Sequence, residues 1–84
     1  MADMNTIASD VAELLDNILG DKIDPMAPTA RLVEDYGANS MDVVDIVERL
    51  ERRFDIKIPN NDIGKLVTFN DVVTYVTTQL QRAK

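Results

Sequence analysis

The sequence contains no cysteine and no histidine. The chain therefore has no thiolate nucleophile, no imidazole base and none of the usual zinc ligands. A disulfide scaffold is excluded, and a serine hydrolase is disfavoured because no histidine can activate a serine hydroxyl. If the protein handles reactive groups, it must carry them on something attached to the chain.

Aromatic residues and long apolar runs are scarce as well. Aromatics make up 5% of the 84 residues, too few for the stacking platforms that bind single-stranded nucleic acids. No apolar run approaches the roughly 20 residues needed to span a bilayer, and the acidic start MADMNTIASD lacks the features of a signal peptide. We expect one cytoplasmic domain, residues 1–84, without membrane insertion and with one modest core.

The net charge of −6 is unevenly distributed along the chain. Residues 1–48 hold 11 acidic and two basic residues, whereas residues 49–84 hold four acidic and seven basic ones. This charge disfavours a polyanionic partner such as nucleic acid. We expect the acidic part of the molecule, residues 1–48, to attract basic protein surfaces. Arg49, Arg52 and Arg53 form a local basic cluster.

The acidic residues do not predict a metal site, because no D-x-[DN]-x-[DN]-G calcium loop occurs. Four of them lie between the first two predicted helices: Asp21, Asp24, Glu34 and Asp35. We expect these four to form a solvated surface with at most weak cation binding.

Apolar residues recur at helical spacing, and alternation with a period of two is absent. The first predicted helix spans residues 4–19 and stops at Gly20. Its apolar stripe comprises Met4, Ile7, Val11, Leu14, Leu15 and Ile18. The second predicted helix spans residues 40–54. Its buried stripe comprises Val43, Ile46, Val47, Leu50 and Phe54.

The last predicted helix begins near Thr68, where Asp71 completes an approximate capping box. Its core face comprises Phe69, Val72, Val73, Val76 and Leu80. A short helix over residues 61–66 is predicted more weakly because it contains Gly64. The sequence thus predicts an all-α fold, a small antiparallel four-helix bundle with three longer helices and one short one.

A long loop over residues 21–39 joins the first two predicted helices and contains two prolines and Gly37. We expect Leu32, Val33 and Tyr36 to pin this loop to the core through one short helical turn. A loop of this length in so small a domain is more often functional than idle.

The start of the second helix is the candidate site. Asn39 is a good N-cap residue, and the carboxylate of Asp42 suits the positive end of the helix dipole. Ser40 would then be the first helical residue, with its hydroxyl free in solvent, at a position that favours a phosphate group. The alternative is that Ser40 is itself the cap.

Met41 and Val44 fall beside Ser40 on the flank of the buried stripe. An exposed apolar pair next to an exposed serine indicates a docking surface. The alternative is that the helix is simply buried over a wider arc.

The segment VEDYGANSMDVVDIVERLERRFDIKIP resembles the prosthetic-group site of the acyl carrier protein family. That family typically reads VEDLGADSLD, followed by an amphipathic helix that ends in E-E-F and by a short I-P link. TARLVEDYG and KLVTFNDVVTYV also fit, so the resemblance covers nearly the whole chain.

The resemblance implies that Ser40 bears a phosphopantetheine arm, which a separate, magnesium-dependent transferase moves from coenzyme A onto the serine hydroxyl. The thiol of the arm would carry acyl groups as thioesters between enzymes of fatty acid or related lipid or secondary-metabolite synthesis. The chain itself would be a monomeric carrier and not an enzyme. An acyl chain could enter between the helices at Val43, Val47, Leu50 and Val72.

The implied partners are the phosphopantetheinyl transferase and acyl-loading and acyl-processing enzymes with basic docking patches, or a dedicated partner. The docking residues would be Asn39, Met41, Asp42, Val44, Asp45, Glu48, Glu51 and Arg52. Three of them depart from the family pattern: Asn39 replaces an aspartate, Glu48 an apolar residue and Arg52 a glutamate. These departures favour a specialised carrier.

The arginines have two interpretations. Asp45–Arg49 and Glu48–Arg52 are i,i+4 pairs in the favourable orientation, each contributing about 0.2–0.5 kcal/mol to helix stability. The arginines would then only decorate a solvated face. Alternatively, they repel the basic patches of ordinary fatty-acid enzymes and reserve the protein for a dedicated partner.

Two other classes stay open at this point. A peptidyl or polyketide-type carrier would share the fold and the serine, although the GANSMD context is closer to the acyl type. An interaction module without a prosthetic group would need only the bundle and its acidic face.

Overall fold

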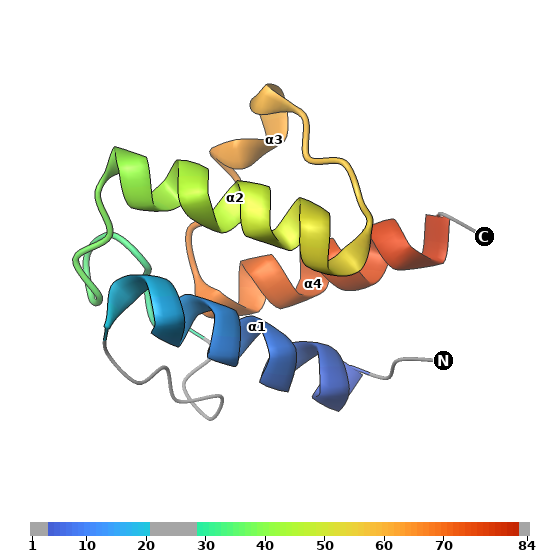
Figure 1. Ribbon diagram of the computed structural model, residues 1–84, viewed down its shortest axis with the longest axis horizontal. Helices are drawn as coiled ribbons and strands as arrows, with labels where there is room; N and C mark the ends of the chain where they lie inside the picture. The colour runs from blue at the N-terminus through green and yellow to red at the C-terminus, as the bar shows by residue number, and fades with distance from the viewer. Residues whose placement is uncertain (1–3, 21–28, 83–84) are drawn as a thin grey trace.

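The computed structural model describes residues 4–20 and 29–82, and within these ranges it contains four helices and no strand (Figure 1). The helices are α1 (Met4–Leu19), α2 (Ser40–Phe54), α3 (Asn60–Ile63) and α4 (Phe69–Arg82). Helices α1, α2 and α4 pack against one another, with α1 antiparallel to the other two. The predicted all-α bundle is confirmed. None of the described helices is long and apolar enough to cross a membrane.

Helix α1 has the predicted bounds and buries one face. The buried side chains are Ile7, Val11, Ala12, Leu14 and Leu15. Ile18 is only half-buried but packs against this core, and the side chain of Met4 lies outside the described part. The helix ends as expected at Gly20, whose φ of 75° is left-handed and whose N–H donates to the Asp16 carbonyl over 2.9 Å.

Helix α2 also has the predicted bounds, and Ile46, Val47 and Leu50 form its buried stripe. Val43 and Phe54, expected in the same stripe, are half-buried because they lie toward its two ends. The next residue, Asp55, adopts a left-handed conformation with φ 55°, which aspartate tolerates better than most residues. The chain then turns away into the connection to α3.

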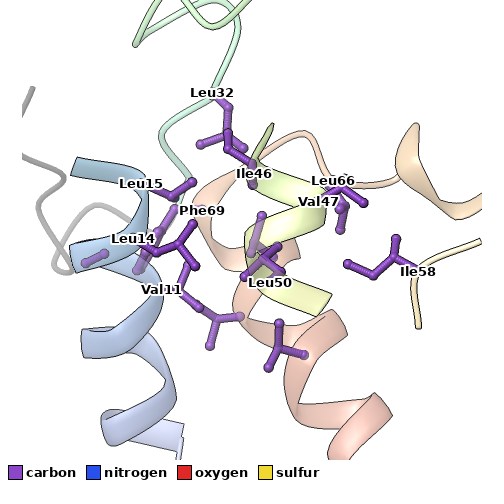
Figure 2. Packing of buried hydrophobic residues seen from close by; sticks show 14 of the residues in the cluster. Val11, Leu14, Leu15, Leu32, Ile46, Val47, Leu50, Ile58, Leu66 and Phe69 are labelled. Carbon is purple, nitrogen blue, oxygen red and sulfur yellow. The ribbon is translucent and has the colours of Figure 1, made fainter. Parts of the chain in front are cut away.

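The core is built from 17 buried apolar side chains, and no polar or charged side chain is buried within the described ranges. Helices α1, α2 and α4 supply most of it. Five members come from outside these helices: Leu32, Ala38, Ile56, Ile58 and Leu66. In Figure 2, Val11 and Leu14 of α1 lie on one side and Ile58 and Leu66 on the other, with Leu50 between them. The segments around α3 therefore close the open side of a three-helix core.

Two of the three expected residues, Leu32 and Tyr36, pack on the core and anchor the described part of the long loop. Leu32 is 2% exposed and Tyr36 is half-buried, but Val33 is 58% exposed, so its predicted anchoring role was wrong. The segment forms the expected turn, with the Asp35 N–H donating to the Arg31 carbonyl over 2.9 Å. Neighbouring residues of such a turn point in different directions, and Leu32 takes the core position.

Two backbone hydrogen bonds tie this loop to the connection between α3 and α4. The Leu32 N–H donates to the Val67 carbonyl over 2.9 Å, and the Phe69 N–H donates to the Ala30 carbonyl over 3.0 Å. The loop that leads into α2 is thereby fixed to the start of α4, although the two segments lie far apart in the sequence.

The short helix is placed differently from the prediction. Helix α3 spans Asn60–Ile63 and not residues 61–66, because Pro59 forms its N-cap and Gly64 its C-cap. Helix α4 follows after the predicted capping box, in which the Asp71 N–H donates to Thr68 Oγ1 and the Thr68 N–H donates to Asp71 Oδ2, both over 3.0 Å. Four of its five expected core residues are buried: Phe69, Val72, Val73 and Val76. The fifth, Leu80, lies near the end of the helix and is half-buried.

Candidate functional site

The first turn of α2 is closed by Asn39 and Asp42. The Asp42 N–H donates to Asn39 Oδ1 over 2.8 Å, and the Asn39 N–H donates to Asp42 Oδ2 over 3.1 Å. The side chain of each residue thus accepts a hydrogen bond from the backbone N–H of the other residue, which is the arrangement of a capping box. Asn39 is therefore the N-cap, as predicted, and the alternative in which Ser40 caps its own helix is wrong.

Ser40 is left with an uncommitted hydroxyl. It is the first residue of α2 and is exposed. Within the described part of the chain its hydroxyl forms no hydrogen bond, because the capping role is already taken by Asn39. A group attached to this oxygen would extend into solvent without disturbing the packing of the helix.

The surroundings of Ser40 suit a phosphodiester. The Ser40 and Met41 N–H groups belong to the first turn, where a helix offers no acceptor of its own. These donors and the positive end of the helix dipole favour a phosphate on the Ser40 oxygen. Because Asp42 is engaged with the Asn39 N–H, its carboxylate is held at the cap.

The segment before Ser40 holds it in a defined place. Gly37 has a left-handed φ of 71°, which lets the chain turn sharply toward the helix. Ala38 is then buried, and its N–H donates to the Leu32 carbonyl over 3.0 Å. Asn39 follows in an extended conformation that suits an N-cap.

Met41 and Val44 lie on the outer surface of α2. Their side chains are 80% and 53% exposed, among the largest apolar exposures in the described chain. The expected exposed pair beside the serine is confirmed, and burial of α2 over a wider arc is wrong. Glu48, one turn beyond Val44, is exposed as well.

The charged side chains of α2 do not all pair as expected. Arg49 Nε and Asp45 Oδ1 lie 3.0 Å apart, which confirms the first predicted pair. The expected Glu48–Arg52 pair is wrong, since among the described residues neither side chain forms an ion pair. Both are exposed, so holding them together would gain little against the loss of side-chain freedom.

Two further contacts on α2 were not expected. Arg53 Nη2 lies 3.0 Å from Asp10 Oδ1 and so bridges α2 to α1. The Ile58 N–H donates to Glu51 Oε2 over 2.9 Å, which turns this predicted docking residue toward the connection to α3. Neither contact has a local sequence signal, because Asp10 and Arg53 are 43 residues apart and Glu51 and Ile58 belong to different elements.

The predicted acyl-chain residues lie mostly in the interior. Val47, Leu50 and Val72 are buried members of the core, to which α2 and α4 both contribute, whereas Val43 is only half-buried. The hollows on the surface lie elsewhere, between α1 and the end of α2 and along the outer face of α3 and α4.

The described residues contain no group of three side chains placed to bind a metal ion. Glu34 pairs with Arg31 over 2.7 Å, and Asp35 accepts a hydrogen bond from the Arg31 N–H over the same distance. These two carboxylates are committed to the loop turn. Asp21 and Asp24 lie outside the described residues.

A second polar contact joins α3 to α4 and was not expected from the sequence. The Tyr75 hydroxyl donates to Asp62 Oδ2 over 2.7 Å. This hydrogen bond, together with one from Lys65, lowers the pKa of Asp62. Burial and the neighbouring carboxylate raise the pKa of Tyr75 to about 12.

Comparisons with known proteins agree with this geometry. A family model described as the phosphopantetheine attachment site matches residues 9–76. An acyl carrier protein of Campylobacter lari is 40% identical over 70 residues, which cover 83% of this chain and 91% of that protein. An acyl carrier protein of Campylobacter concisus is 43% identical over 56 residues, which cover 64% of this chain and 73% of that protein.

A solved structure supports the fold. The acyl carrier protein of Thermotoga maritima superposes with a TM-score of 0.78 over 96% of this chain and 94% of its own, at 21% identity. This likeness concerns the arrangement of the helices alone, whereas the sequence matches carry the family assignment. The chain belongs to the acyl carrier protein family and is a phosphopantetheine-bearing acyl carrier.

Proposed function

We propose that Ser40 is the residue that bears phosphopantetheine. The observation that carries this proposal is the capping box: Asn39 and Asp42 satisfy the start of α2 between them, and the exposed hydroxyl of Ser40 has no structural duty. When bound, phosphopantetheine supplies a terminal thiol that carries acyl groups as thioesters. The chain itself has no cysteine to supply one.

The role of the protein is to present the phosphopantetheine arm and to be recognised by partner enzymes. The chain has no histidine or cysteine, so we assign the chemistry to separate enzymes and the role of a monomeric, cytoplasmic, single-domain carrier to this protein. A phosphopantetheinyl transferase attaches the arm, and acyl-loading and acyl-processing enzymes of fatty acid or related synthesis use it.

The outer face of α2 would be the surface on which these enzymes dock. Met41 and Val44 offer apolar contact close to Ser40, and Asp42, Asp45 and Glu48 place carboxylates around them. A partner with a small apolar surface surrounded by basic residues would match this pattern in both respects. Glu51, although half-buried, would lie at the edge of this surface, with its carboxylate accepting the Ile58 N–H.

An attached acyl chain would shelter between α2 and α4, beside the residues expected from the sequence. Val47, Leu50 and Val72 form an apolar interior there, and the half-buried Val43 would mark the way in. Burial gains about 0.8 kcal/mol per methylene, so even a short chain would offset part of the cost of separating the helices.

The test is intact-mass analysis after co-expression with a phosphopantetheinyl transferase of broad specificity. We expect one phosphopantetheine on the wild type and none on Ser40→Ala. Ser9→Ala, at an exposed serine on α1, is the matched control and should be modified fully. Modification of Ser40→Ala, or a wild type that no transferase modifies, would contradict the assignment.

A further inference from the structure

A groove of about 250 Å³ lies between α1 and the last turns of α2, which run side by side in Figure 1. The groove is at the far end of α2 from Ser40, since Arg52 lies 12 residues further on, or about 18 Å along the helix axis. Its lining residues are Glu13, Leu14, Asn17, Arg49, Arg52 and Arg53.

The groove is separated from Met41 and Val44 along the axis of α2. Arg52 lies eight residues beyond Val44 and 11 beyond Met41, or about 12 and 16 Å along the helix axis. Around the axis, Arg49 lies about 140° from Val44, whereas Arg52 lies about 80° from Val44 and about 20° from Met41. Arg52 therefore belongs both to the groove and to the far end of the predicted docking face.

The charges of the groove single out Arg52. Arg49 is paired with Asp45 and Arg53 with Asp10, each at 3.0 Å. Among the described residues, Arg52 has no acidic partner, and its side chain lies exposed at the rim. A guanidinium has five N–H donors in a planar fork that matches a carboxylate, so Arg52 is the unpaired group that an incoming anion would meet.

The remaining lining residues set the other requirements for an occupant. Leu14 supplies an apolar floor that is still 8% exposed, next to the amide of Asn17. Glu13 lies on the α1 wall and forms no ion pair with the three arginines in the described part of the chain. An incoming carboxylate must therefore lie on the α2 side of the groove, with an apolar side chain over Leu14.

We propose that this groove docks an acidic segment of a partner protein, which presents a carboxylate to Arg52 and an apolar side chain to Leu14. The complementarity of charge, together with the apolar floor, favours this occupant over a basic surface. The inference does not rest on Ser40 or on its modification, because it concerns the opposite end of α2.

The test uses a fluorescein-labelled amphipathic peptide of glutamate, leucine and alanine, with a matched peptide in which glutamine replaces glutamate. Fluorescence anisotropy with the unmodified full chain should show saturable binding of the glutamate peptide only. Arg52→Glu should weaken binding by about tenfold or more, the order expected for a charge-assisted contact replaced by repulsion. Lys57→Glu, the same charge change at an exposed residue outside the groove, should weaken it less than about twofold.

Chemical-shift mapping locates the site. The peptide should shift the NMR signals of Leu14, Asn17 and Arg52 and leave those of Met41 and Val44 in place. The proposal is overturned if binding does not saturate, if the shifts fall on Met41 and Val44, or if Lys57→Glu is as harmful as Arg52→Glu. Concentration-dependent shifts in the groove without peptide would assign it to a second copy of this chain and would overturn it equally.

Discussion

Asn39 and Asp42 exchange hydrogen bonds across the first turn of α2, side chain to backbone in both directions, at 2.8 and 3.1 Å. The position of the helix start is therefore set by these two residues, and Ser40 between them takes no part. The helix cap and the proposed attachment site thus belong to neighbouring but separate side chains.

Replacing the cap should cost stability, whereas replacing the serine should not. We expect Asn39→Ala to lower the free energy of unfolding by about 1 kcal/mol, because it leaves the Asp42 N–H unsatisfied. Ser40→Ala should change it by less than about 0.5 kcal/mol, as for other surface substitutions. Urea unfolding followed by circular dichroism measures both. Equal losses for the two variants would mean that Ser40 shares the capping role.

Two valines one turn apart on α2 should respond very differently to a charge. Val44→Asp should stay within about ±0.5 kcal/mol of the wild-type stability, because Val44 is 53% exposed, yet it should slow phosphopantetheine attachment. Val47→Asp should unfold the domain, because it places an unpaired carboxylate in the core. Thermal melts and initial rates of modification separate the two effects. A Val44→Asp variant modified at the wild-type rate would remove this residue from the docking surface.

The Tyr75–Asp62 hydrogen bond should make stability depend on pH at both extremes. The raised pKa of Tyr75 stabilises the fold below the ordinary tyrosine value of 10, and this contribution is lost as pH rises toward about 12. The lowered pKa of Asp62 stabilises the fold above the ordinary value of 3.8, and this contribution is lost as pH falls below it.

Tyr75→Phe removes the hydroxyl, so it should abolish the effect of Tyr75 and weaken that of Asp62, whose pKa Lys65 still lowers. We expect a lower urea midpoint than wild type at pH 7, and a difference between the two proteins that shrinks on going from pH 10 toward 12. Comparing the two proteins at each pH cancels the titration of the lysines. If the difference in urea midpoint between the two proteins stays constant from pH 10 to 12, the protonated Tyr75 hydroxyl does not stabilise the fold.

The choice of partner enzymes should depend on Asn39 and Arg52. The double variant Asn39→Asp with Arg52→Glu restores two acidic positions typical of the family while keeping a residue that can cap α2. We expect a standard malonyl-loading transacylase to load it faster than wild type at low salt, with a smaller advantage at moderate salt because the charges are exposed. Asn39→Gln, a neutral change, is the control. If the double variant is loaded no faster at either salt concentration, Arg52 does not select partners.

The helical period was sufficient to predict the fold's main elements. The bounds of α1 and α2 follow from apolar residues that recur on one face, from Gly20 as a stop and from Asn39 as a cap. The first turn of α2 could be predicted for the same reason, since the capping box involves residues only three positions apart. Local sequence carries such information because the interacting groups are local.

The errors occur where distant segments meet. Whether Leu32 or Val33 faces the core depends on where the loop meets Val67, 35 residues further along the chain. Arg53 binds Asp10 on another helix, and the exposed Glu48 and Arg52 stay apart. The groove between α1 and α2 has no signature in either helix alone, because Glu13 and Arg52 are brought near it only by packing.

The composition of the interior has a consequence for how the molecule can rearrange. Every buried side chain in residues 4–20 and 29–82 is apolar. Moving α2 away from α4 therefore breaks no hydrogen bond of a buried side chain and leaves no buried charge without a partner. The cost is dispersion contact alone, and an inserted hydrocarbon restores contact of the same kind. We therefore expect the interior to accept a hydrocarbon chain while the hydrogen-bonded caps that fix the helix starts stay intact.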